Sequence, residues 1–89
     1  NLAGMPEPEQ TAALEALLAE LRDMAMLAAG EPAERLRHPA SAERLFPVAA
    51  SAPIEVWVAK ARMVEEARER LRGHGNAKLV FDKLARALA

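Results

Sequence analysis

The chain has 89 residues, enough for one domain whose folding hides roughly 60–65% of the surface that the unfolded chain exposes. Apolar residues make up 52% of it, mostly Ala and Leu, and aromatic residues only 3%, a composition that favours helices over strands. The absence of Cys excludes disulfides and thiolate metal sites, and a net charge of −1 lacks the basic excess typical of nucleic-acid-binding domains. We therefore expect an all-α fold, a single small bundle of about four to five helices.

A short lead-in precedes the first predicted helix. Gly4, Pro6 and the nearby Pro8 predict that residues 1–7 form a linker or disordered segment, which leaves residues 8–89 as the folded domain. The helix is predicted from about Pro8 to Ala29, because a proline in the first turn has no N–H whose loss matters there. Gly30 is the expected residue just past its end. Its apolar stripe, with the helical period of 3.6, consists of Leu14, Leu17, Leu18, Leu21, Met24, Ala25 and Ala28.

Residues 31–40 are predicted to connect two helices. One helical turn within them would bring Leu36 onto the core. Pro39 disfavours the helical conformation for the residue before it, so His38 is expected to be extended. Neither His38 nor His74 has the spacing of a metal ligand, and His38 is interpreted as a turn residue.

The next predicted helix is short and contains a proline. Ser41 is the expected N-cap of a helix over residues 42–46. Pro47 would clash with the carbonyl of Glu43, so either this helix breaks near Phe46 or a new turn begins at Pro47. The residues predicted to be buried here are Leu45, Phe46 and Val48.

Residues 54–58 alternate between apolar and other side chains, as a strand would, but a helix is the better interpretation. The run continues to Arg72 without a turn signal, and no second strand is available to pair with it. Ser51 is the expected cap, and Pro53 suits the first turn. The predicted apolar face comprises Ile54, Trp57, Val58, Ala61, Val64 and Leu71.

Two glycines separate this helix from the last one. Gly73 is expected to end the long helix, and Gly75 gives the backbone freedom to reverse. Asn76 is the predicted cap of a closing helix over Ala77 to Leu88. So short a reversal predicts that the last two helices pack antiparallel. The predicted core face of the closing helix comprises Val80, Phe81, Leu84 and Leu88.

Charge is distributed unevenly along the chain. Residues 1–45 carry eight acidic and four basic side chains, a net −4, and residues 46–89 carry five acidic and eight basic ones, a net +3. Solvated helix faces explain this split, and Arg62–Glu66 and Glu66–Arg70 have the spacing of stabilising helix pairs. The alternative is a subunit that presents opposite charge to two neighbours.

The sequence contains no motif that predicts catalysis or ligand binding. Its glycines form no phosphate-binding loop, and Ser41 and Ser51 have capping roles with no histidine placed to activate them. We expect no enzyme activity, cofactor, metal, small-molecule ligand or direct nucleic-acid contact. No apolar run has the roughly 18 residues of a membrane span, and the acidic N-terminus is unlike a signal peptide, so a soluble cytoplasmic protein is expected. A start at Asn1 rather than Met suggests an excised fragment or a processed chain.

Two segments resemble a known family. The first is Leu-Leu-Ala-Glu-Leu-Arg-Asp-Met-Ala-Met-Leu-Ala-Ala-Gly at residues 17–30, followed by Leu-Arg-His-Pro at 36–39. The second runs from Glu66 to Leu84 and places a Gly-His-Gly-Asn turn before a Leu-rich helix. Both are similar to the C-terminal collar domain of bacterial DNA polymerase III clamp-loader subunits, with delta-prime the nearest type and gamma/tau the next. The resemblance covers about residues 12–88, although Pro47 and the turn depart from the usual pattern.

The resemblance implies a non-catalytic helical domain that packs with other clamp-loader subunits into a collar. This collar supports loading of the sliding clamp in DNA replication. The candidate subunit-interface residues are Trp57, Arg62, Met63, Arg70 and Phe81. For the three apolar ones the alternative is that they fill the core, and for the arginines that they belong to a solvated face. The alternative function is a generic helical adaptor, or a self-associating module, unrelated to replication.

Overall fold

The computed structural model describes residues 4–73 and 76–89. This part of the chain contains four α-helices: α1 (Glu7–Ala28), α2 (Ala42–Ala49), α3 (Ile54–Arg72) and α4 (Ala77–Leu88). Two 3₁₀ helices, η2 (Ala33–Arg35) and η3 (Pro39–Ser41), lie between α1 and α2. The described residues include no strand, which confirms the prediction of a small all-helical bundle.

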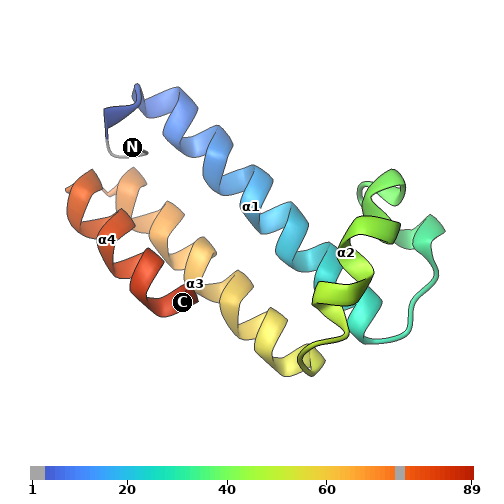
Figure 1. The fold of residues 1–89 in the computed structure, drawn as a ribbon. Helices are drawn as coiled ribbons and strands as arrows, with labels where there is room; N and C mark the ends of the chain where they lie inside the picture. Colours follow the sequence, from blue (N-terminus) through green and yellow to red (C-terminus); the bar gives the residue numbers. More distant parts are fainter. Residues whose placement is uncertain (1–3, 74–75) are drawn as a thin grey trace.

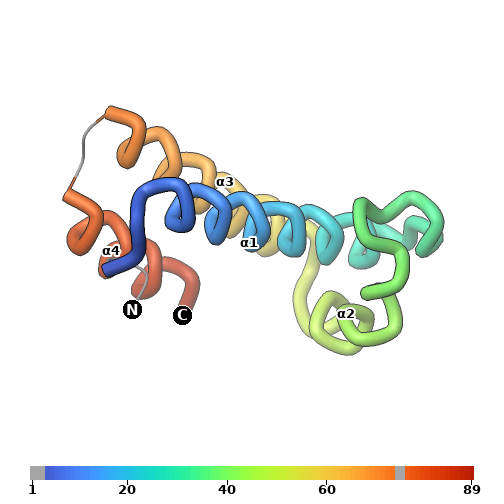
Figure 2. Tube along the Cα trace, turned by 90° about the horizontal axis from the view of Figure 1, so that it is seen from above, coloured from blue at the N-terminus to red at the C-terminus, as the bar shows by residue number. Residues whose placement is uncertain are grey.

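The helices are arranged around one long antiparallel pair, α1 and α3 (Figure 1). The short helix α2 packs beside the C-terminal half of α1, and α4 folds back antiparallel along the C-terminal half of α3, as predicted (Figure 1). Seen from above, α2 and α4 lie on the same side of the α1/α3 pair (Figure 2). The opposite side of that pair is therefore left without a covering helix.

The core lies where the three long helices and α2 meet. The predicted stripes of α1 and α4 do point into it, and the expected burial of Leu36 is confirmed at 5% exposed. None of the helices in the described residues combines the length and hydropathy that a bilayer crossing requires. The buried apolar residues are Leu14, Leu18, Leu21, Met24, Leu27, Leu36, Leu45, Ala49, Trp57, Ala61, Val64, Ala67, Val80, Phe81 and Leu84.

Two predicted helix ends are confirmed in atomic detail. Past α1, Gly30 has a φ of 85°, and its N–H donates to the carbonyl of Leu27 at 3.0 Å. The N–H of Glu31 donates to the carbonyl of Met26 at 3.0 Å, which completes a Schellman motif. At α4, the side chain of Asn76 accepts from the N–H of Leu79 at 3.2 Å. His74 and Gly75 of the predicted turn lie outside the described residues.

Around Pro47 the predicted burial of Leu45 is confirmed, but the predicted helix break and the burial of Phe46 and Val48 were wrong. Helix α2 runs through Pro47 without a break, and Phe46 and Val48 are 57% and 48% exposed rather than buried. Leu45 and Ala49, one turn apart, are the residues that face α1, and their burial holds a helix that the proline alone would disfavour. Phe46 and Val48 point elsewhere, because neighbouring helical positions are rotated by about 100°.

Neither predicted serine cap is formed. Ser41 stands at the N-cap position of α2 without a side-chain cap bond, because η3 leads directly into the helix with Ser41 already helical. Ser51 lies in the turn after α2, where its hydroxyl donates to the carbonyl of Val48 at 2.5 Å. Pro53 is the N-cap residue of α3.

Candidate interaction surface

A groove runs along the side of the α1/α3 pair that α2 and α4 leave uncovered. Its volume is about 470 Å³. Ile54 and Val58, predicted to face the core, are 36% and 37% exposed, and Met26 is partly buried. The apolar residues that line the groove are Ala25, Met26 and Ala29 from α1 and Ile54, Val58 and Ala61 from α3.

The groove exists because the apolar stripes of α1 and α3 are wider than the contact between the two helices. On α3, Trp57 and Ala61 are buried against neighbouring helices, and Val58 lies about 100° further round. Alanines at positions 25, 29 and 61 fill little space, so the two helices enclose a hollow rather than a ridge. Small residues in such a place let another backbone approach closely.

Charged side chains border the groove. The guanidinium of Arg22 on α1 lies 3.4 Å from the carboxylate of Glu65 on α3. Both side chains are about half exposed, at 53% and 44%, so this pair contributes about 0.2–1 kcal/mol to stability. Arg62 and Glu31 complete the border. The rim can therefore orient a partner by charge while the floor buries apolar surface.

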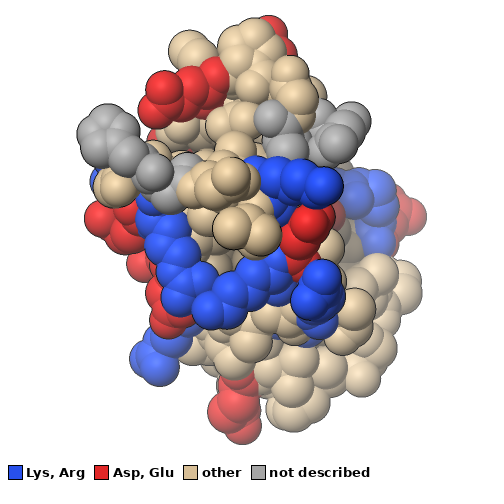
Figure 3. Space-filling model, turned by 90° about the vertical axis from the view of Figure 1, so that its left-hand side faces the viewer, with Lys and Arg blue, Asp and Glu red and all other residues tan. Residues whose placement is uncertain are grey.

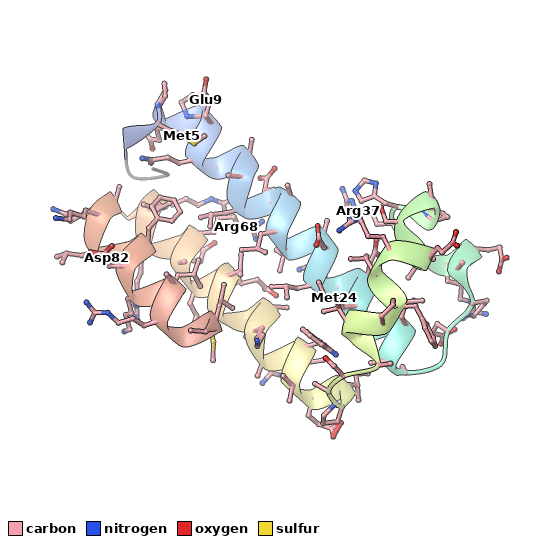
Figure 4. All side chains as sticks on the ribbon, viewed as in Figure 1. Met5, Glu9, Met24, Arg37, Arg68 and Asp82 are labelled. Carbon is pink, nitrogen blue, oxygen red and sulfur yellow. The ribbon has the colours of Figure 1, made fainter. Side chains whose placement is uncertain are left out.

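A second, polar hollow of about 270 Å³ continues from the groove along α1. Three arginines line it: Arg22 from α1, Arg37 from the connector and Arg68 from α3. Glu15 is the carboxylate that lines it within the described residues. The Nε of Arg68 is buried and has no hydrogen-bond partner in that same set. We call this hollow the arginine pocket, and in Figure 4 Arg68 lies between α1 and α3.

Arg37 is held in place by a buried carboxylate that the sequence interpretation did not identify. Asp23 of α1 is 3% exposed, and its two oxygens accept the backbone N–H groups of Arg37 at 2.8 Å and His38 at 3.1 Å. The bonds tie the connector to α1 just after Leu36 enters the core. One Asp on an amphipathic helix carries no signal of this role, because the connector returns to it only in the folded chain.

The structure separates the five candidate interface residues. Trp57 and Phe81 are 6% and 8% exposed, so they fill the chain's own core and have little surface left for a neighbour. Met63 and Arg70 line a hollow of about 50 Å³ between α3 and α4. Arg62 lies on the rim of the α1/α3 groove. The apolar residues of the groove were absent from the interface prediction, because exposed apolar positions cannot be told from core positions by periodicity.

Trp57 connects three helices. Its indole N–H donates to the carbonyls of Ala49 at 3.0 Å and Ala52 at 3.3 Å. The ammonium of Lys60 lies 5.5 Å from the centre of the indole ring and donates to the carbonyl of Leu88 at 3.0 Å, near the end of α4. The residue therefore orients the start of α3 against α2 and, through Lys60, against α4.

The pairing predicted along α3 does not form. In the described part of the chain, Glu66 makes no ion pair with Arg62 or Arg70. Arg72 instead pairs with Glu69 at 3.0 Å. The physical reason is that exposed pairs gain about as much as ordering two long side chains costs, so the spacing alone does not fix a partner.

Basic side chains gather at the end of the bundle where α3 meets α4. Figure 3 shows Lys and Arg crossing the middle of this face, with carboxylates beside them. This mixture fits the expectation of a solvated surface better than a continuous phosphate-binding stripe. The exposed bases on the last turn of α3 and on α4 are Arg70, Arg72, Lys78, Lys83 and Arg86.

Within residues 4–73 and 76–89 no group of three or more His, Cys, Asp or Glu side chains is arranged to hold a metal ion. Comparison with protein families, with characterised proteins and with solved structures finds no match to this chain.

Proposed function

We propose that this chain is a non-catalytic assembly domain of a bacterial DNA polymerase III clamp-loader subunit, of the delta-prime type. In this role it packs with other subunits into the collar that supports loading of the sliding clamp. The observation that carries the proposal is the uncovered apolar groove between α1 and α3. A domain that closes its own core but keeps such a groove has surface suited to a neighbouring subunit.

The two segments that resemble the clamp-loader family support the clamp loader as the complex that this domain joins. The first forms most of α1 and ends at Gly30 with the expected left-handed residue. The second forms the end of α3 and most of α4, with Asn76 as the cap after the turn. The antiparallel arrangement of α3 and α4 agrees with the helical hairpin that the resemblance implies.

The experiment is reconstitution with purified clamp-loader subunits, followed by size-exclusion chromatography with light scattering. The chain is expected to enter a stoichiometric complex with them. A chain that stays separate at micromolar concentrations, while the other subunits assemble, rules the proposal out. Leu79→Glu is the control: Leu79 on α4 is 68% exposed and does not line the groove, so this change is expected to leave the complex intact.

The rival function is a helical adaptor or a self-associating module. The same groove serves either role, because it does not by itself select a clamp-loader neighbour. Sedimentation equilibrium on the isolated chain separates the two. A monomer that joins clamp-loader subunits favours the collar role, and a tight dimer that ignores them favours the rival.

A further inference from the structure

The groove and the arginine pocket form one continuous surface. Arg22 lines both, and the lining residues of α3 extend from Ile54 to Arg68. At a rise of about 1.5 Å per residue, this stretch is about 21 Å long, which matches roughly four turns of helix. One end is apolar and the other is dominated by guanidinium groups. A ligand of this surface must be elongated and chemically different at its two ends.

The arginine pocket has more positive charge than its surroundings neutralise. Arg22 is paired with Glu65, but Arg37 and Arg68 take part in none of the ion pairs of the described residues. The buried Nε of Arg68 is a donor without an acceptor, an arrangement that an incoming acceptor would relieve. With Arg22 paired, Glu15 is left as the lining carboxylate for the two guanidiniums of Arg37 and Arg68. The nearby Asp23 already accepts two backbone N–H groups of the connector. An incoming carboxylate can accept hydrogen bonds from two guanidiniums at once.

The shape of the groove suits a helix. Its walls are two antiparallel helices, so a third helix can lie between them with its side chains over the alanines at 25, 29 and 61. Ile54, Val58 and Met26 then meet an apolar stripe on that helix. A segment in extended conformation would leave backbone N–H and C=O groups unpaired against this apolar floor.

We propose that the α1/α3 face binds an amphipathic helix of another protein, whose apolar stripe fills the groove and whose terminal Asp or Glu enters the arginine pocket. This inference rests on the proposed assembly function and names the partner's chemistry. In the clamp-loader role, the helix belongs to a neighbouring subunit.

The chain's own exposed segments are poorer occupants. The exposed face of α4 carries three bases, Lys78, Lys83 and Arg86, against one carboxylate, Asp82, so the arginine pocket repels it on balance. Helix α2 carries the exposed Phe46 but spans only 8 residues, too few to cover the whole surface. A second copy is therefore an outcome of the test rather than the expected partner.

The test selects binders from a library of displayed helical peptides, about five turns long, against the full chain. Selected helices are expected to carry an apolar stripe and to be enriched in Asp or Glu near one end. Val58→Glu is expected to weaken their binding about tenfold or more, and Leu79→Glu to leave it unchanged. Arg68→Gln is expected to weaken the binding of peptides with an acidic end. It should not change the binding of the same peptides when Gln replaces the acidic residue.

Several outcomes overturn the inference. If the selected helices lack an acidic end, the arginine pocket is not part of their site. If binding survives both Val58→Glu and Ile54→Glu, in variants whose circular dichroism is unchanged, the ligand binds elsewhere. Dimerisation of the chain that Val58→Glu abolishes makes a second copy the occupant. If no helix is selected, and single-stranded DNA binds the wild type but binds Arg68→Gln more weakly, then phosphate is the ligand of the pocket.

The inference and the proposed function fail separately. If clamp-loader subunits bind the chain and Val58→Glu leaves that complex intact, the collar role stands and this face is not its interface. If the subunits ignore the chain while acidic helices are selected by it, the surface stands and the clamp-loader role does not.

Discussion

The indole N–H of Trp57 donates to the carbonyl of Ala49 at 3.0 Å, which joins the first turns of α3 to the last turn of α2. Both residues are buried, at 6% and 0% exposed. Together with the bond to the carbonyl of Ala52 at 3.3 Å, this contact fixes the start of α3 against a helix of 8 residues that contains a proline. The contact also explains why the one tryptophan of the chain can lie in the core, because its polar N–H has an acceptor there.

Replacing Trp57 tests how much of its contribution to stability comes from the hydrogen bond. Trp57→Phe keeps an aromatic ring but removes the donor, and is expected to lower the free energy of unfolding by about 1 kcal/mol. Trp57→Ala also leaves a cavity and is expected to cost about 3–5 kcal/mol. Urea unfolding followed by circular dichroism measures both. Equal losses in the two variants would show that ring packing contributes little.

Asp23 is expected to be the main attachment of the connector to α1. Asp23→Ala leaves the N–H groups of Arg37 and His38 without their acceptor and should cost about 1–3 kcal/mol. Amide hydrogen exchange at those two residues should become faster. The matched control is Asp82→Ala on the exposed side of α4, which should change stability by less than about 0.5 kcal/mol. Unchanged exchange at Arg37 and His38 would contradict the assignment.

Gly30 and Gly73 both follow long helices, but alanine should act oppositely at the two positions. At Gly30 a Cβ meets no atom within 4 Å, so Gly30→Ala is expected to cost about 1–2 kcal/mol through its φ of 85° alone. Gly73 has a φ of −83°, and a Cβ there makes only ordinary contacts, the nearest at 3.6 Å. Gly73→Ala should therefore be neutral or stabilise by up to about 1 kcal/mol. Thermal unfolding of the two variants, side by side, is the measurement.

Asn76 and Ser41 were both predicted to cap a helix, but only Asn76 forms the cap bond, so the two residues make a matched pair. Asn76→Ala removes the bond to the N–H of Leu79 and is expected to lower the free energy of unfolding by about 1 kcal/mol. Ser41→Ala removes no cap bond and should change it by only a few tenths of a kcal/mol. Denaturant titrations with a common m-value decide the comparison. A larger loss at Ser41 than at Asn76 is the result that would count against it.

The sequence alone determined the three longer helices, α1, α3 and α4, and several of their ends. The stripe of α1, the left-handed Gly30 and the cap at Asn76 depend on residues within a few positions of one another, so local rules suffice. The antiparallel α3 and α4 follow from the shortness of the turn between them. The all-helical class follows from composition in the same local way.

Only the tertiary structure decided which apolar residues are buried by other helices and which polar residues are hydrogen-bonded to distant segments. Pro47 lies inside a helix because Leu45 and Ala49 are buried against α1, which outweighs a local preference. Asp23 is a buried acceptor because the connector returns to it from 14 residues away. The groove beside Val58 is open because α2 and α4 pack on the other side of the α1/α3 pair. Each depends on contacts between distant segments, and periodicity carries no information about these.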